Sequence, residues 1–140
     1  MDKKSKEVTL LLVEDDDVDA MTIERSFLKQ RISNKIVRAY DGIEALALLR
    51  QDTVPRPLII LLDLQMPRMG GIEFLKELRA DVNLSHLVVF VLTTSKSEED
   101  MLSSYKQHIA GYFVKGQSGE KFLEIVNVID SYWKVVELPE

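Results

Sequence analysis

Cysteine is missing from the 140 residues of this chain. A disulfide, a thiolate metal site and a cysteine nucleophile are therefore excluded, and a reducing compartment suits the chain by default. Long apolar segments are also missing, because the longest runs cover residues 58–62 and 87–92, whereas a membrane span needs about 18 or more residues. The basic start after Met1 resembles a secretion signal, but the apolar stretch that follows ends at Glu14 without a small-residue cleavage site. We therefore expect a cytoplasmic protein that does not enter a membrane.

Basic residues are also fewer than acidic ones. Eighteen basic residues stand against 23 acidic ones, which leaves a formal net charge of −5. Such a chain has no overall positive field that would attract nucleic acid, so we expect no nucleic-acid partner. The length suits a single domain, which we place at residues 7–136. Only seven residues follow Trp133, so no output domain is expected.

Five short apolar segments alternate with longer amphipathic segments. The apolar segments are too short for helices and predict buried strands. Parallel strands need a crossover of about a dozen residues or more, which the amphipathic segments supply as helices. The fold class is therefore α/β, with a doubly wound, five-stranded parallel sheet and five helices. The predicted strands are residues 8–13, 36–40, 58–62, 87–92 and 111–114, and the predicted helices begin near Val18, Gly42, Ile72, Ser97 and Ser118.

Apolar spacing also predicts which helix positions pack on the sheet. Arg38 within the second strand indicates an edge strand, and Asp16 or Asp17 is expected to cap the first helix. The predicted packed positions are Met21, Ile23, Phe27 and Leu28 in the first helix, and Ile43, Leu46 and Leu49 in the second.

Polar side chains directly follow four of the predicted strands. In an open α/β sheet, sites form outside the carboxyl ends of the strands, where these residues meet. Converging carboxylates repel one another, and a hard divalent cation with oxygen ligands relieves the repulsion. Mg²⁺ suits the site better than zinc, since no histidine or thiol lies near the acids. The strand-end residues are Glu14 to Asp17, Asp63, Thr93 to Ser95, and Lys115.

This combination indicates phosphoryl chemistry. Phosphoryl transfer depends mostly on positioning and charge neutralisation, which a carboxylate, a cation, a hydroxyl and an ammonium supply together. Asp63 ends the most apolar strand and is the natural nucleophile, while Thr93 and Lys115 would contact the phosphoryl group. Each residue alone has an ordinary explanation as a helix cap, a turn residue or a surface charge. Four such coincidences at four strand ends make the ordinary explanation a poor one.

Four sequence blocks resemble the receiver domain of bacterial response regulators. The resemblance covers residues 7–134, with every block in order. It implies a flavodoxin-like three-layer sandwich with strand order 2-1-3-4-5. The blocks are LLVEDD at 11–16, LDLQMPRMGG at 62–71, VLTTS at 91–95 and GYFVK at 111–115.

The resemblance implies a role for each matching residue. Asp63 would accept a phosphoryl group from a histidine kinase, Thr93 would move toward that group, and Lys115 would neutralise it. Tyr112 would be an aromatic switch that turns inward when Thr93 shifts. The implied ligands of Mg²⁺ are Glu14, Asp15, Asp63 and the backbone carbonyl of Gln65.

Two positions depart from the family pattern. Gly116 replaces the proline that usually follows the lysine, so we expect a trans peptide bond there and a differently shaped loop. Thr94 is larger than the usual alanine or glycine, and we expect it to narrow access to the phosphoryl group.

A closer resemblance is to the small stand-alone regulators that partner bacterial phytochrome histidine kinases. It is carried by Glu14 in place of the commoner aspartate, by residues 92–95, by the missing proline, and by the sequence Ser131-Tyr132-Trp133. The final helix is apolar over about half its circumference, more than one sheet face requires. We therefore expect a homodimer through this helix, with the alternative that its end folds back on the domain. The predicted interface residues are Phe122, Ile125, Ile129, Tyr132 and Trp133.

The leading hypothesis is thus a signalling module that catalyses only its own phosphorylation and dephosphorylation. An alternative is a small Mg²⁺-dependent phosphatase that acts through an aspartyl phosphate. Dehalogenase-type phosphatases have a second acid two residues after the nucleophile, where this chain has Gln65, which counts against turnover. A flavodoxin-like FMN carrier is a third hypothesis, but the acids after the first strand would repel the FMN phosphate.

Overall fold

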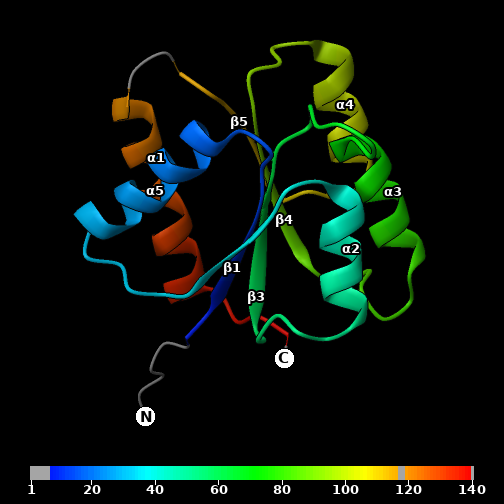
Figure 1. The fold of residues 1–140 in the computed structure, drawn as a ribbon, viewed down its shortest axis with the longest axis horizontal. Coiled ribbons are helices and arrows are strands. Elements are labelled where there is room, and N and C mark those ends of the chain that lie inside the picture. The colour runs from blue at the N-terminus through cyan, green and yellow to red at the C-terminus, as the bar shows by residue number, and fades with distance from the viewer. Residues whose placement is uncertain (1–6, 117–118, 140) are drawn as a thin grey trace.

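A computed structural model describes residues 7–116 and 119–139, in which strands and helices alternate along the chain (Figure 1). The predicted alternation is confirmed. Ser118, where we expected the last helix to begin, lies outside the described residues. The elements are β1 (Thr9–Val13), α1 (Asp17–Lys29), β2 (Ile36–Ala39), α2 (Gly42–Arg50), β3 (Leu58–Leu62), α3 (Gly71–Ala80), β4 (Val88–Thr93), α4 (Glu98–Lys106), β5 (Gly111–Val114) and α5 (Gly119–Val135).

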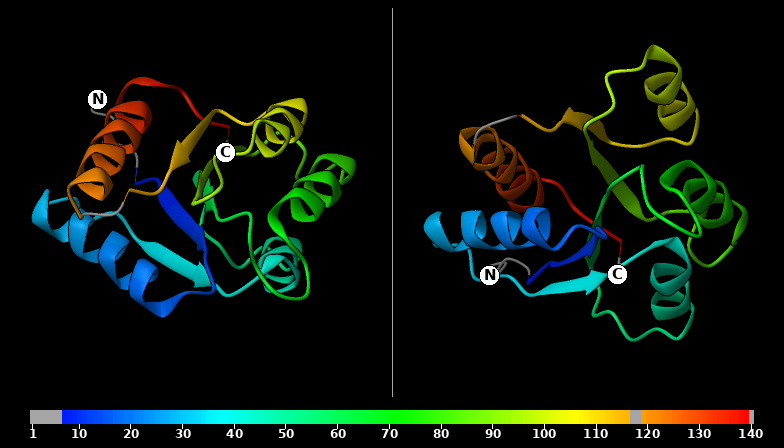
Figure 2. Two further views of the ribbon diagram at one scale, coloured as in Figure 1. Left: turned by 90° about the horizontal axis from the view of Figure 1, so that it is seen from above. Right: turned by 45° about the horizontal axis from the view of Figure 1, so that its top comes forward.

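The five strands form one parallel sheet in the order β2-β1-β3-β4-β5. Figure 2 shows α1 and α5 on one face of this sheet and α2, α3 and α4 on the other. The predicted three-layer sandwich and strand order are confirmed. Among the described residues, no helix is both long and apolar enough to cross a bilayer.

Two apolar cores lie on opposite faces of the sheet. Side chains alternate along a strand, so Leu11 and Val13 of β1 join the core under α2 and α3, while Leu10 and Leu12 join the core under α1 and α5. Both faces of the central strands are covered, which explains why β3 is apolar throughout and β1 is apolar after Thr9. The polar residues that follow these apolar runs therefore lie at the carboxyl edge of the sheet.

Several helix positions predicted to pack on the sheet are exposed instead. Met21 and Leu28 of α1 and Ile43 of α2 face outward, with Leu28 73% exposed. The buried stripe of α1 consists of Ala20, Ile23, Ser26 and Phe27. The prediction was too broad because a helix resting on one sheet face buries only the residues centred on that face.

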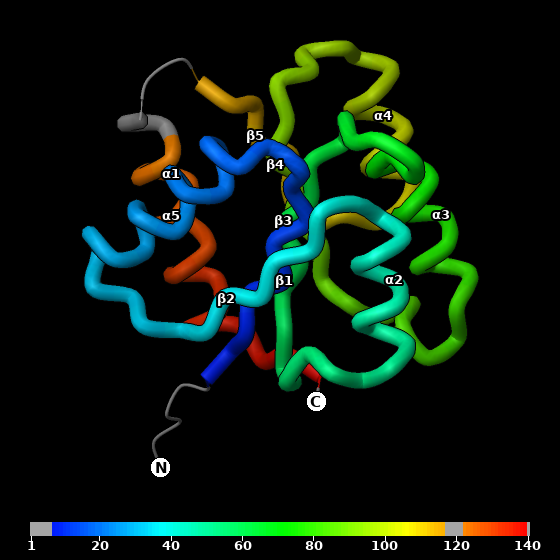
Figure 3. The backbone as a smooth tube through the Cα atoms, viewed as in Figure 1, coloured from blue at the N-terminus to red at the C-terminus, as the bar shows by residue number. Residues whose placement is uncertain are grey.

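Most side chains of the predicted dimer interface on the final helix are covered within the chain. Phe122, Ile125, Ile129 and Trp133 are at most 7% exposed within the single chain. The helix packs on the sheet and also beside α1, as Figure 3 shows, and the Phe27 and Trp133 ring centroids are 5.9 Å apart. Tyr132 is half-buried, and its ring lies edge-to-face with that of Phe90 at a centroid distance of 5.1 Å. Two contact surfaces within the chain explain the wide apolar arc, so these five side chains do not form an exposed face.

Candidate functional site

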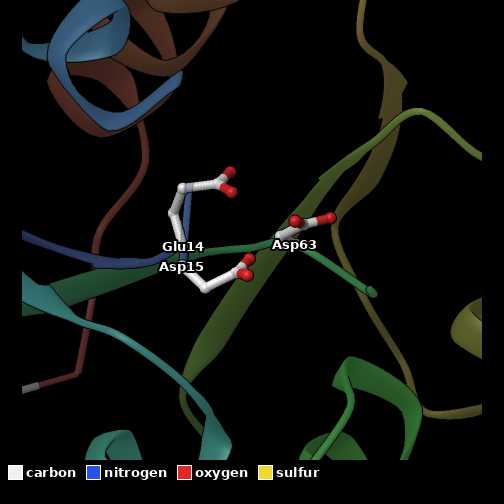
Figure 4. Close-up of side chains that lie close together, drawn as sticks. All are labelled: Glu14, Asp15 and Asp63. Carbon is white, nitrogen blue, oxygen red and sulfur yellow. The ribbon is translucent and has the colours of Figure 1, made fainter. Parts of the chain in front are cut away.

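Three carboxylates meet at the carboxyl edge of the sheet. One carboxylate oxygen from each of Glu14, Asp15 and Asp63 lies within 4.8 Å of the others. Figure 4 shows the Glu14 and Asp15 side chains leaving the end of β1 and extending toward Asp63 at the end of β3. Glu14 is 1% exposed and Asp63 6%, whereas Asp15 is exposed. These closely spaced hard oxygen ligands fit a divalent cation, which would offset their mutual repulsion.

The short connection from β1 to α1 places the first two acids. The Glu14 N–H still donates to the Ala39 carbonyl at 3.0 Å, as if β1 continued for one more residue. Asp16 already caps α1, since its side chain accepts hydrogen bonds from the Val18 and Asp19 N–H groups. The predicted cap is therefore confirmed at Asp16. Only Glu14 and Asp15 lie between strand and cap, which confines both to the rim.

Arg38 holds this connection from the neighbouring edge strand. Its Nε and Nη2 atoms donate to the Glu14 carbonyl at 3.0 and 2.8 Å, and its Nη1 atom donates to Asp17 at 2.8 Å. The guanidinium also lies 4.1 Å from the centroid of the Tyr40 ring. Sequence reasoning found the edge position of Arg38 but missed this role. The only available signal was a long cationic side chain in the strand beside the acids.

Lys115 reaches into the same site from the end of β5. Its Nζ atom donates to Glu14 at 3.0 Å and to Asp19 at 2.8 Å, and lies 3.6 Å from Asp63. The side chain is almost completely buried. The structure therefore brings the predicted lysine to the predicted acids. It also adds Asp19, which sequence reasoning missed although it lies only four residues after Asp15.

Burial and charge shift the pKa values of this group. Burial, together with the negative charge of Asp63, raises the pKa of Glu14 to about 8 despite the opposing effect of Lys115. Burial alone would lower the pKa of Lys115, but the hydrogen bond to Asp19 and the charges of Asp63 and Glu14 raise it well above its ordinary value. The lysine thus stays an ammonium, and the site carries a buried acid that a bound cation would help to ionise.

The hydroxyl side of the site is built around Ser95. Thr93 is fully buried at the end of β4, and its Oγ1 atom accepts a hydrogen bond from the Ser95 N–H at 3.3 Å. The half-buried Tyr112 side chain donates from its hydroxyl to the Ser95 carbonyl at 3.0 Å. The Ser95 hydroxyl in turn donates to Asp100 of α4 at 2.6 Å. One residue therefore contacts Thr93, Tyr112 and α4.

Thr94 and Gln65 lie beside Asp63 at the carboxyl edge of the sheet. Thr94 donates from its hydroxyl to the Gln65 side-chain oxygen at 3.0 Å, and the Gln65 N–H donates to the Asp63 carboxylate at 3.2 Å. The Lys115 N–H donates to the Thr93 carbonyl at 2.8 Å, which continues the β4–β5 pairing into the site. The bond between Lys115 and Gly116 is trans, as predicted. The shape of the following loop depends on residues 117 and 118, which lie outside the described part of the chain.

A parallel sheet with three carboxylates, a buried threonine and a buried lysine at one edge defines the class of protein. The response regulator receiver domain family matches residues 10–127, and the chain belongs to this family. The predicted family is confirmed.

Individual relatives extend this assignment. Response regulator Rcp1 of Synechocystis sp. (strain ATCC 27184 / PCC 6803 / Kazusa) is 34% identical over 143 residues, covering 99% of this chain and 97% of Rcp1. The phosphorylated cyanobacterial phytochrome response regulator RcpA matches the structure with a TM-score of 0.87 and 34% identity, covering 95% of this chain and 99% of that one. The Mn(2+)-bound form of response regulator Rcp1 matches with a TM-score of 0.84 over the same shares. The predicted resemblance to regulators of phytochrome systems is confirmed.

Proposed function

We propose that this receiver domain accepts a phosphoryl group on Asp63 from a histidine kinase and passes its state on by protein contact. The observation that carries the proposal is the position of the Lys115 ammonium, which lies 3.6 Å from Asp63 and 3.0 Å from Glu14, two of the three carboxylates in the cluster. A carboxylate nucleophile, a cation site and a fixed ammonium are the groups that phosphoryl transfer needs. The structure of a phosphorylated phytochrome response regulator that resembles this chain supports the proposal.

The chemistry follows from the side chains. An Asp63 carboxylate oxygen attacks the phosphorus atom, the phosphorus–nitrogen bond of the donor histidine breaks, and the imidazole leaves with the bonding electrons. Lys115 and the Thr93 hydroxyl would contact the oxygens of the transferred group. Glu14, Asp15, Asp63 and the Gln65 carbonyl would hold Mg²⁺, which supplies charge neutralisation when bound. Rcp1 in its Mn(2+)-bound form supports a divalent cation at this site.

The partner and cellular context are part of the proposal. The kinase would be of the phytochrome type, as the names of the similar regulators suggest. Action in the cytoplasm and the absence of a nucleic-acid partner stay predictions. A homodimer also stays a prediction. The side chains of α5 that are buried within the chain are not available to its interface, but exposed apolar residues such as Leu102 of α4 and Val128 of α5 support it. Sedimentation velocity with and without phosphorylation tests the dimer, which a monomer at every concentration would exclude.

Mass spectrometry after incubation with acetyl phosphate and Mg²⁺ tests the phosphoacceptor. The expected result is one added phosphoryl group, which is absent in Asp63→Asn and present in the control Asp52→Asn, whose side chain is exposed. Phosphorylation that persists in Asp63→Asn would contradict the assignment. Continuous hydrolysis of small phosphate esters would instead support a phosphatase.

A further inference from the structure

The Lys115 ammonium is shared unequally among three carboxylates. A lysine ammonium has three N–H groups, and two of them donate to Asp19 at 2.8 Å and to Glu14 at 3.0 Å. The Asp63 carboxylate lies 3.6 Å away, beyond hydrogen-bond distance. One N–H is therefore left for the region beside Asp63, where a phosphoryl oxygen would lie.

Asp19 differs from the other two carboxylates in its position. Glu14 and Asp63 belong to the carboxylate cluster that could hold a cation, and Asp19 does not. Asp19 lies in the first turn of α1, where its N–H donates to the capping side chain of Asp16 at 3.1 Å. It is therefore fixed on a helix, close to the site but outside the cluster. Its side chain is 29% exposed, against 6% for Lys115.

A cation in the cluster would change the competition for the lysine. The oxygens of Glu14 and Asp63 would then point to the cation, and the cation would repel the nearby ammonium. Asp19 lies outside the cluster, so its carboxylate can accept a hydrogen bond from Lys115 without competition from the cation. Without it, a buried ammonium beside a divalent cation would lose the negative partner that the cation does not engage, which is costly in a poorly solvated site.

We propose that Asp19 is a positioning residue that keeps the Lys115 ammonium beside Asp63 when a cation occupies the carboxylate cluster. One ammonium N–H stays bonded to Asp19, and another stays directed at the oxygens of the group on Asp63. This inference rests on the proposed phosphoacceptor function and assigns a specific partner to the lysine.

The test measures binding of beryllium trifluoride, a phosphoryl mimic, at saturating Mg²⁺ by calorimetry. Asp19→Asn keeps the size of the side chain but removes its charge, and we expect at least about fivefold weaker binding. The matched control is Glu24→Gln, which removes one negative charge further along the same helix and should leave binding within about twofold of the parent. Asp19→Glu restores the charge and should recover part of the lost affinity.

Two further measurements separate positioning from a general structural role. In a Lys115→Ala background, Asp19→Asn should change the affinity by less than about twofold, because the partner is gone. In urea unfolding of the metal-free proteins, the change in the free energy of unfolding of the double variant should differ from the sum of the changes in Asp19→Asn and Lys115→Ala. Equal binding by Asp19→Asn and Glu24→Gln, or an undiminished effect without Lys115, would overturn the inference. Failure of the parent protein to bind the mimic or to be phosphorylated on Asp63 would instead overturn the proposed function on which it rests.

Discussion

Arg38 donates two hydrogen bonds, of 2.8 and 3.0 Å, to the backbone carbonyl of Glu14. A side chain on an edge strand thus fixes the backbone of a residue that supplies a carboxylate to the site. Arg38→Lys keeps the charge but cannot present two N–H groups in a planar fork. We expect the variant to bind Mg²⁺ about tenfold more weakly, which is typical of losing a supporting partner of a metal ligand.

Calorimetric titration with Mg²⁺ measures this effect. The matched control is Arg25→Lys, which makes the same change at an exposed position of α1. Unfolding in urea should show that Arg38→Lys costs only about 1 kcal/mol of stability. Unchanged Mg²⁺ affinity in a folded Arg38→Lys protein would show that the carbonyl contact does not position the acids.

The raised pKa of Glu14, about 8, predicts a pH-dependent cation site. Below that pH, Mg²⁺ must displace a proton from Glu14, so binding should strengthen by up to about tenfold per pH unit and level off above pH 8. Glu14→Gln cannot release a proton there, and its binding should be weaker and nearly independent of pH. Calorimetry from pH 6 to 9 tests both, and parallel pH profiles would exclude Glu14 as the titrating group.

The same shift predicts how the stability of the metal-free protein changes with pH. Glu14 has an ordinary pKa of 4.5 in the unfolded chain and about 8 in the folded one, so the folded state binds its proton more tightly. The resulting stabilisation is present below pH 4.5 and is lost progressively as the pH rises to 8. Between pH 5 and 8, the parent should lose stability relative to Glu14→Gln in urea unfolding. If the difference in the free energy of unfolding between the two proteins did not change with pH, the raised pKa of Glu14 would be contradicted.

The Ser95 hydroxyl joins the β4–α4 connection to α4 through its 2.6 Å hydrogen bond with Asp100. Ser95→Ala removes this bond and should cost about 1 kcal/mol of stability. It should also increase amide hydrogen exchange at residues 94–97 and at Tyr112. The control Ser103→Ala makes the same change at a serine within α4, and there we expect no increase in hydrogen exchange at these residues. Equal exchange in the two variants would show that Ser95 does not hold this connection.

Thr94 and Gln65 form a hydrogen-bonded pair at the rim beside Asp63. If the pair limits the approach of water to the acyl phosphate, Thr94→Ala should shorten the phosphorylated lifetime about two- to fivefold, a barrier change below about 1 kcal/mol. Thr94→Ser keeps the hydroxyl and serves as the control. The lifetime is measured by mass spectrometry after removal of acetyl phosphate. An equal or longer lifetime in Thr94→Ala would contradict the predicted restriction of access.

The main features of the fold and site follow from local sequence patterns. Short apolar runs predicted all five strands, and the residues that follow them, such as Asp63 and Lys115, were predicted to meet at one edge. The Asp16 cap could also be predicted from the sequence, because a helix cap depends on neighbouring residues. The hydrogen bond from Lys115 to Asp19 could not be predicted in this way, since Asp19 is 96 residues away and the contact depends on how far a flexible side chain extends.

The sequence by itself determined the α/β alternation, the carboxyl-edge position of the site and the identity of its acids, because strand length and polarity are local properties. Only the tertiary structure decided that α5 buries Trp133 against Phe27 of α1, so that this side chain is covered within the chain. It also decided that Arg38 holds Glu14 and that Asp19 shares Lys115. Periodicity shows that a helix face is apolar but not which element covers it, and hydrogen-bond partners depend on distances that differ by less than 1 Å.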